Sequence, residues 1–348
     1  MRLRRSDCSG PGIHRRRQGR GFVYIDGEGE RIADEEALLR IHELVIPPAW
    51  QDVWICPYPG GHIQATGIDQ RGRKQYLYHR RWRERRDQQK FDDMVEFAGS
   101  LPALRARVEA DLGGEPLGRE RVLAAAVRLL DRGFFRIGSE DYAVTNETYG
   151  LATMKRRHVT VEGDAIVFDY PAKHGKRHLR AVVDPAIAEL IARLKKRRGA
   201  HDELLAYKEG RSWVDVKSGD INAYLKQATG RDVSAKDFRT WNATVLAAVT
   251  LAASNSADMS PTKRKRLITH AVKQVAYYLG NTPAVARGSY IDPRVFDRFR
   301  DGIVIDVHAV ADHDDDDATA IQGPAEEAVL DLITGESVRR SPLLQRAA

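Results

Sequence analysis

The sequence contains few cysteines and no long apolar run. Its 348 residues include only two cysteines, Cys8 and Cys56, which lie far apart and outside any CxxC or Cys/His cluster. Neither a disulfide framework nor a structural zinc site is therefore expected, and this cysteine usage favours a reducing compartment. No run of about 18 apolar residues is present, and the arginine-rich N-terminus lacks the apolar core of a secretory signal. We expect a soluble, cytoplasmic protein without a membrane segment.

The sequence also lacks the common motifs of nucleotide and metal chemistry. Gly175-Lys176 has neither the upstream glycine nor the following Ser/Thr of a Walker A loop, and no HExxH motif occurs. The aspartates Asp314 to Asp317 are more typical of a solvated acidic tail than of a Mg²⁺ site. We therefore expect no cofactor and no metal.

Positive charge is concentrated in one part of the chain. The 56 Lys+Arg exceed the 49 Asp+Glu, for a formal net charge of +7. One stretch, broken only by Glu84 and Asp87, holds Arg71, Arg73, Lys74, Arg80, Arg81, Arg83, Arg85, Arg86 and Lys90. A cluster of this kind favours a polyanionic partner.

The patterning predicts four segments and an α+β fold. Residues 1–20 form a basic arm without hydrophobic periodicity, which we expect to be mobile. Residues 21–90 predict a small β-rich domain, with short aromatic or β-branched strands and one helix. Residues 91–302 predict a mainly helical domain that carries a small antiparallel sheet. Residues 303–348 shift in composition and predict an acidic, flexible tail.

Periodicity places the elements within these segments. The expected strands are Phe22–Ile25, Val53–Cys56, Gln75–Tyr78, Val159–Val161, Ala165–Tyr170 and His178–Val183. The expected helices are Asp34–Leu44, one that Gly133 ends, Pro185–Arg198, Ile221–Ala228, Phe238–Ala253 and Thr262–Leu279. Lys173 then lies at the tip of a hairpin.

Five residues match the requirements of a metal-free attack on a phosphodiester. Tyr290 supplies a phenol as nucleophile, and Arg136 and Arg239 supply guanidinium groups for the phosphoryl oxygens. Lys173 supplies an ammonium that can protonate a leaving alkoxide, and Asn281 supplies a neutral hydrogen-bond donor. Arg239 is expected in the first turn of its helix, where the positive end of the dipole disfavours a cation unless an anion binds there.

Each residue also has a plainer interpretation. Arg136 can cap a helix C-terminus, and Lys173 can be a solvated charge at a turn. Asn281 suits a helix C-cap, and Tyr290 suits a core position with a satisfied hydroxyl. Taken singly, none of these residues decides the chemistry.

The joint pattern resembles the type IB DNA topoisomerases of the small bacterial and poxvirus-like branch. Leu279–Tyr290 and Lys236–Trp241 are similar to the C-terminal signature of that family. Further similar segments are Ile46–Trp50, Gly72–Tyr78 and Leu129–Gly138, so the resemblance covers residues from about 20 to 300. Asn281 departs from the pattern, because many members have histidine at this position, nine residues before the tyrosine.

The resemblance implies a clamp around double-stranded DNA and a nucleoid-associated, monomeric enzyme. It assigns Tyr290 as the nucleophile, Arg136 and Arg239 as the catalytic arginines and Lys173 as the proton donor, with Asn281 assisting. The implied reaction relaxes supercoiled DNA through a 3′-phosphotyrosyl intermediate, strand rotation and religation, without ATP or metal. Asparagine cannot titrate near neutral pH, so any role for it is limited to hydrogen bonding.

The resemblance also implies DNA contacts from the β-rich domain. Gln75, Tyr76 and Tyr78 match positions that the family directs at the major groove, although the two tyrosines also suit one face of an ordinary strand. Arg73, Lys74 and Lys236 are the further basic candidates. Two alternatives stay open at this point: a tyrosine recombinase or integrase, and a non-catalytic DNA-binding nucleoid protein.

Overall fold

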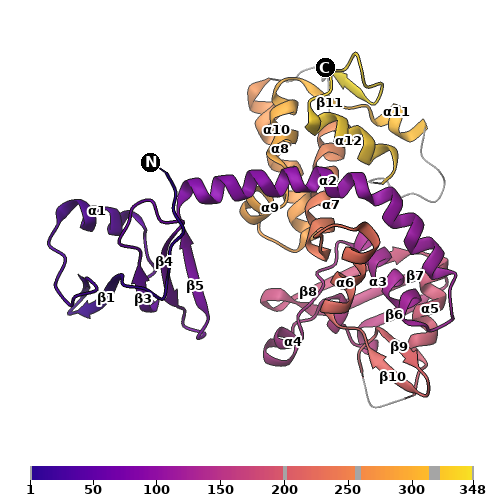
Figure 1. Ribbon diagram of the computed structural model, residues 1–348. Coiled ribbons are helices and arrows are strands. Elements are labelled where there is room, and N and C mark those ends of the chain that lie inside the picture. Colours follow the sequence, from indigo (N-terminus) through magenta and orange to yellow (C-terminus); the bar gives the residue numbers. More distant parts are fainter. Residues whose placement is uncertain (1, 199–201, 255–259, 313–321, 347–348) are drawn as a thin grey trace. The chain divides into compact units, whose positions relative to one another are not determined.

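The computed structural model describes residues 2–198, 202–254, 260–312 and 322–346 (Figure 1). The chain divides into two compact units, Met1–Phe91 and Asp92–Ala348. The boundary falls inside a long helix, α2 (Arg80–Leu112). The first unit is rich in strands and the second is mainly helical with small sheets, so the predicted α+β class is confirmed.

The first unit is built on one antiparallel sheet. Its elements are β1 (Ile13–Gln18), β2 (Gly21–Ile25), α1 (Glu35–Glu43), β3 (Gln51–Ile55), β4 (Ile63–Ile68) and β5 (Lys74–Tyr78), and the strand order is β2-β1-β3-β4-β5. Asp34 caps α1, because its carboxylate accepts the Ala37 N–H at 2.8 Å. Ile41 of α1 packs with Ile13, Val53 and Ile55 in the core of this unit.

The expectation of a mobile basic arm at residues 1–20 is wrong for most of that segment. β1 lies between β2 and β3 in the sheet, and Ile13 is almost fully buried. Before β1, the backbone N–H of Arg4 donates to the Gly60 carbonyl at 2.9 Å. The strand was hidden because Ile13 is its only buried residue, and the half-buried Arg15 uses its guanidinium to donate to the carbonyls of Ile46, Pro47 and Trp50.

The second unit contains the remaining elements. Its helices after α2 are α3 (Arg119–Gly133), α4 (Glu140–Asn146), α5 (Pro185–Lys195), α6 (Ser218–Thr229), α7 (Ala235–Ala253), α8 (Pro261–Leu279), α9 (Pro283–Ser289), α10 (Pro293–Arg300), α11 (Val307–Asp312) and α12 (Pro324–Thr334). Its strands are β6 (Val159–Glu162), β7 (Ala165–Ala172), β8 (Lys176–Val183), β9 (Ala206–Glu209), β10 (Ser212–Asp215), β11 (Ile303–Ile305) and β12 (Leu344–Arg346). Among the described residues, no helix is long and apolar enough to cross a membrane.

The core of the second unit forms around α3 and α7. Both helices bury residues on most of their faces, and Trp241, Phe135 and Phe238 are among the largest side chains that are fully buried. The sheet β6-β7-β8 is antiparallel, and the β7–β8 pairing ends at Ala172 and Lys176. Lys173–Gly175 forms the one-turn helix at the hairpin tip, as expected for Lys173.

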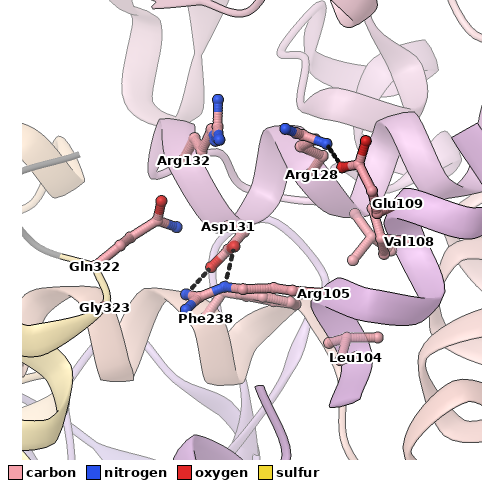
Figure 2. A pocket seen from close by; sticks show the side chains of 11 residues that line it. Leu104, Arg105, Val108, Glu109, Arg128, Asp131, Arg132, Phe238, Gln322 and Gly323 are labelled. Carbon is pink, nitrogen blue, oxygen red and sulfur yellow. Dashed lines mark hydrogen bonds and ion pairs between the residues drawn. The ribbon is translucent and has the colours of Figure 1, made fainter. Parts of the chain in front are cut away.

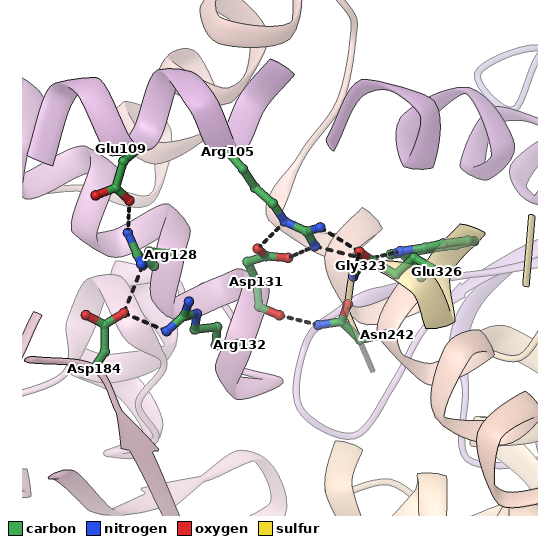
Figure 3. Close-up of polar contacts among 10 residues, drawn as sticks. Arg105, Glu109, Arg128, Asp131, Arg132, Asp184, Asn242, Gly323 and Glu326 are labelled. Carbon is green, nitrogen blue, oxygen red and sulfur yellow. Dashed lines mark hydrogen bonds and ion pairs between the residues drawn. The ribbon is translucent and has the colours of Figure 1, made fainter. Parts of the chain in front are cut away.

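The C-terminal segment is also part of the folded unit, which corrects the expectation of a flexible tail. β12 pairs with β11, and α12 buries Ala325, Ala328 and Val329. Glu326 accepts hydrogen bonds from Arg105 of α2 (Figure 3). The indole N–H of Trp241 on α7 donates to the same carboxylate. The run Asp314 to Asp317 lies outside the described residues.

Candidate active site

Four of the five predicted catalytic residues line one cavity of about 290 Å³ in the second unit. Arg136, Lys173, Arg239 and Tyr290 line it together with Lys236. The other lining residues are Ile137, Gly138, Ser139, Thr148, Tyr149 and Ala235. The cavity therefore joins the loop after α3, the tip of the β7–β8 hairpin, the start of α7 and the residue after α9.

Arg239 lies in the second turn of α7, not in the first turn as expected. α7 begins at Ala235, and Asp237 takes the first-turn position that the helix dipole favours, accepting the Ser234 N–H at 2.8 Å. The Arg239 guanidinium is buried and donates to the Phe134 carbonyl at 2.6 Å and to the Leu279 carbonyl at 2.9 Å. Burial lowers its pKa to about 10, so it remains charged at neutral pH.

Arg136 is positioned by the backbone that follows the C-terminus of α3, where Phe134 adopts a left-handed conformation. Gly133 is the last helical residue, but the left-handed conformation that often ends a helix is taken by Phe134, with φ 55°. A Cβ at Gly133 would approach the Phe135 ring to 2.1 Å, so glycine is required there for space. Arg136 follows directly, and its guanidinium donates to the side-chain oxygen of Asn281. Arg136 therefore does not serve as a simple helix cap.

Asn281 lies just beyond the C-terminus of α8. Gly280, not Asn281, takes the left-handed C-cap conformation, with φ 63°, and the Asn281 N–H closes the turn on the Ala276 carbonyl at 3.0 Å. The Asn281 side chain is thereby freed from capping and reaches Arg136. Asn281 does not line the cavity itself but joins it through this contact.

Tyr290 is half-buried and follows α9, and α7 holds its backbone. The Tyr290 N–H donates to the Ala286 carbonyl at 3.0 Å, and the Thr244 hydroxyl of α7 lies 3.3 Å from the Tyr290 carbonyl oxygen. The same hydroxyl accepts the Asp292 N–H at 3.1 Å. The Arg239 guanidinium lies 5.3 Å from the centre of the Tyr290 ring. The nucleophile candidate and one arginine candidate thus share α7 as their support.

The electrostatics of the site make the phenol of Tyr290 easier to ionise. Burial alone would raise the pKa of Tyr290, but the charges of Arg239 and Arg136 are the main causes that outweigh it, so the pKa is lowered. In the described part of the chain, three buried nitrogens on these residues have no hydrogen-bond partner of standard geometry: Arg136 Nε, Arg239 Nε and Asn281 Nδ2. A cluster of unsatisfied donors suits an anion, because an unpaired buried donor is costly.

Lys173 and Lys236 complete the positive rim of the cavity. Both side chains are exposed and line the cavity from the hairpin tip and from α7. Sequence reasoning missed Ser139, Thr148 and Tyr149, which also line the cavity. Their polar types carry no periodic signal, and only their closeness in sequence to Arg136 pointed toward this region.

Comparisons with known proteins match both units of the chain. Residues 79–304, more than half of the chain, match the model of the eukaryotic DNA topoisomerase I catalytic core, and residues 21–69 match the bacterial DNA topoisomerase IB N-terminal domain. The DNA topoisomerase 1B of Acanthamoeba polyphaga mimivirus is 30% identical over 288 residues, covering 80% of this chain and 85% of the viral protein. The chain belongs to the type IB DNA topoisomerases.

More distant viral members agree with this family. The DNA topoisomerase 1B of Vaccinia virus (strain Copenhagen) is 23% identical over 243 residues, covering 70% of this chain and 74% of that protein. The DNA topoisomerase 1 of Rabbit fibroma virus (strain Kasza) is 23% identical over 291 residues, covering 78% and 87%. The resemblance inferred from the motifs is therefore confirmed at the level of the family.

Five of the six candidate DNA-contacting residues of this type IB topoisomerase lie on and beside β5, an edge strand of the first unit, whereas Lys236 is on α7. Tyr76 and Tyr78 are 43% and 41% exposed, and their rings lie 6.1 Å apart at 21°, so they form one stacked aromatic pair. Gln75 and Arg73 both donate to Asp69 Oδ2, at 2.9 and 2.7 Å. Hydrogen bonding from Arg73 is the main cause that lowers the pKa of Asp69 to about 2. Lys74 lies exposed beside the Tyr76 ring.

A second cavity of about 290 Å³ in the topoisomerase lies between α2, α3 and the segment before α12 (Figure 2). Arginines line it, but carboxylates accompany them (Figure 3). Arg105 pairs with Asp131 at 2.8 Å and with Glu326 at 2.5 Å. Arg128 and Arg132 pair with Asp184 at 2.8 and 3.0 Å. Because these cations are neutralised, the second cavity differs from the first and carries no sign of an anion site.

Proposed function

We propose that this chain relaxes supercoiled DNA by transient single-strand cleavage through a 3′-phosphotyrosyl intermediate, followed by strand rotation and religation, without ATP or metal. One observation carries the proposal. The phenol of Tyr290, with its lowered pKa, shares a cavity with Arg136, Arg239 and Lys173. The relatives named above are topoisomerases, and these residue types supply the chemistry that a phosphodiester exchange needs.

The proposed step conserves the number of phosphodiester bonds. The Tyr290 phenol loses its proton to solvent, and its oxygen forms a bond to the phosphorus of the backbone. The bond from phosphorus to the 5′-oxygen breaks, and Lys173 gives that oxygen a proton. Because the new bond replaces the old one, religation by the reverse step needs no external source of energy.

The two arginines stabilise the charge that develops on the phosphoryl oxygens. Arg239 is held by two backbone carbonyls, so its position is fixed before DNA binds, and its Nε remains unsatisfied. Arg136 Nε and Asn281 Nδ2 are unsatisfied as well. A phosphate group that accepts from these donors removes the cost of burying them, and the gain is greatest when the phosphate carries its largest charge.

The first unit supplies the sequence-independent and groove contacts in this proposal. The exposed tyrosine pair on β5 and the basic residues near it suit phosphate and base edges of duplex DNA. Arg73 and Gln75 must exchange Asp69 for DNA when they bind. In this proposal the enzyme is a monomeric clamp, to which both units contribute DNA contacts.

A plasmid relaxation assay with EDTA and without ATP tests the proposal. The wild-type chain should relax supercoiled plasmid under these conditions and should leave a covalent protein–DNA adduct when the reaction is stopped with detergent. Tyr290→Phe removes only the nucleophilic oxygen, so it should abolish relaxation and the adduct while DNA affinity stays near wild type. Adduct formation or full relaxation by Tyr290→Phe would refute the nucleophile assignment, and a wild-type chain that binds DNA without relaxing it would favour the non-catalytic alternative.

A further inference from the structure

The β7–β8 hairpin that carries Lys173 is fastened to the C-terminus of α8, next to Asn281. Lys173 itself is exposed at the tip, between the paired residues Ala172 and Lys176. An ammonium on a hairpin tip has no fixed position unless the strands behind it are held. The Tyr149 N–H holds β7 by donating to the Pro171 carbonyl at 2.9 Å. Two side chains on one face of β8, His178 and Arg180, connect the other strand to α8.

His178 packs against the glycine that precedes Asn281. In the hairpin register His178 lies opposite Tyr170, and their ring centres are 5.8 Å apart. On its other side the imidazole meets Gly280, where a Cβ would come within 2.1 Å of His178 Nε2. Glycine is required at position 280 for two reasons. Its φ is 63°, and the imidazole occupies the space that a side chain would need.

Arg180 caps the last turn of α8 from the outside. Its guanidinium donates to the Tyr278 carbonyl at 2.5 Å and to the Tyr277 carbonyl at 3.3 Å. Arg239 takes the next carbonyl, that of Leu279, from the buried side. Two arginines thus satisfy three consecutive carbonyls at the negative end of the α8 dipole. One of the two belongs to the proposed catalytic set and the other to the Lys173 hairpin.

We propose that His178 and Arg180 are positioning residues that seat the Lys173 hairpin on the α8 C-terminus, so that the ammonium reaches the leaving oxygen beside Asn281. This inference rests on the proposed function of Lys173. α8 keeps its hydrogen bond from Arg239 when Arg180 is removed, and β7 keeps its pairing with β6, so the change loosens the contact between β8 and α8. Removing Arg180 therefore impairs proton donation by Lys173 and leaves Arg136 and Arg239 in place.

The test is a double-mutant cycle on single-turnover cleavage at saturating DNA. Lys173→Ala should slow cleavage by roughly 10²- to 10⁴-fold, the usual contribution of a general acid. Arg180→Met and His178→Ala should each slow it by up to roughly 10²-fold, the usual cost of displacing a reacting group by about 1 Å. Arg180→Met should slow Lys173→Ala no further, because the displaced group is already absent.

Arg177→Met is the matched control. Arg177 lies on the same strand but pairs with Asp169 of β7 instead of α8, so its removal should leave the cleavage rate unchanged. Arg180→Lys keeps the charge but not the planar guanidinium, whose Nη2 makes both contacts to α8, and should fall between wild type and Arg180→Met. It also serves as the working variant if Arg180→Met does not fold, as judged by its thermal midpoint.

A substrate with a 5′-phosphorothiolate at the scissile bond separates positioning from a merely structural role. A thiolate leaves without needing a proton, so this substrate should restore the rate of Arg180→Met as it restores that of Lys173→Ala. A double mutant slower by the product of the single effects, or a wild-type rate in Arg180→Met, would overturn the inference. A wild-type rate in Lys173→Ala would instead overturn the proposed general acid, so the two failures are distinguishable.

Discussion

At the scale of single residues, the candidate site is marked by two arginines whose hydrogen-bonding capacity is only partly used. Arg239 and Arg136 each use part of a guanidinium to hold backbone or Asn281, and each keeps a buried Nε without a partner in the described residues. The same two charges lower the pKa of Tyr290. One pair of side chains therefore has two effects. It makes the nucleophile easier to ionise, and it provides donors that remain unused until a phosphate binds.

His178 gives the site a pH dependence that stability measurements can detect. Its burial, followed by nearby positive charge, lowers its pKa from 6.5 to about 4. The charges that face it are Arg180 and Lys176 of β8, Arg136 and Arg239, and Tyr170 of β7 lies against the ring. Below pH 6.5 the unfolded chain binds the proton more readily than the folded chain does, so the folded state loses stability as the pH falls from 6.5 toward 4.

We expect His178→Phe to flatten this part of the stability profile. The free energy of unfolding, measured with urea at several pH values between 4 and 7.5, should fall less steeply in the variant than in the wild type below pH 6.5. Above pH 6.5 the two curves should run parallel, because His178 is neutral in both states. Equal slopes below pH 6.5 would show that the imidazole is not shielded from protonation. His270, which is exposed on α8, offers the matched control His270→Phe.

The sequence was enough to predict which residues belong to the candidate site. It did not predict their positions within the helices or their hydrogen-bond partners. Tyr290, Arg136, Arg239 and Lys173 were named from their types and motifs, and the structure places all four on one cavity. The expected position of Arg239 was wrong by a turn, because the apolar pattern starts at Phe238 whereas the helix starts at its cap, Ser234. Partners such as Phe134 and Leu279 lie 105 and 40 residues away in sequence, and no local pattern encodes them.

At the scale of elements, the sequence indicates least clearly that α12 is part of the folded unit. Its amphipathic stretch was visible, but the aspartate run before it suggested a solvated tail. The partners that fix it, Arg105 on α2 and Trp241 on α7, are 221 and 85 residues away from Glu326. The short strands β9 and β10 also went unpredicted, since four residues give too little alternation to read.

Removing the carboxylate of Glu326 should destabilise the second unit strongly. Glu326→Ala leaves the partly buried Arg105 with one carboxylate fewer and the indole N–H of the fully buried Trp241 without an acceptor. Breaking a buried pair in this way costs about 3–5 kcal/mol, and we expect the free energy of unfolding to fall by about 3 kcal/mol. Glu327→Ala, an exposed position in the same turn of α12, is the control and should change stability little. Equal effects of the two variants would show that α12 contributes no specific anchor.

At the scale of the whole molecule, the uneven charge predicts how binding responds to salt. The basic stretch between Arg71 and Lys90 belongs to the first unit, and Arg85 and Arg86 are exposed on α2. If these residues neutralise phosphates, log affinity should fall with log salt at a slope near −0.9 per phosphate, for roughly 6–10 phosphates. A slope near zero would contradict a DNA clamp.

The arginines on α2 can be tested within the same experiment. Arg85→Ala with Arg86→Ala should reduce the magnitude of the slope by about 0.9 for each phosphate that these two side chains neutralise in the wild type. Arg193→Ala is the comparison, because Arg193 already pairs with Glu189 on α5. Its slope should match that of the wild type. Fluorescence anisotropy with a labelled duplex at several salt concentrations gives all three slopes.

The shared support of Tyr290 and Arg239 on α7 has a mechanical consequence under the proposed reaction. While the broken strand rotates, its 3′ end is joined covalently to the protein through the Tyr290 side chain, and any tension in that strand pulls on the backbone of this residue. Thr244 and the adjoining Asp292 N–H connect this backbone to α7, a helix that is buried along most of its length. The pull is therefore transmitted to the interior of the unit, and the tyrosine and its arginine shift together under strain, so their alignment for religation persists while the DNA turns.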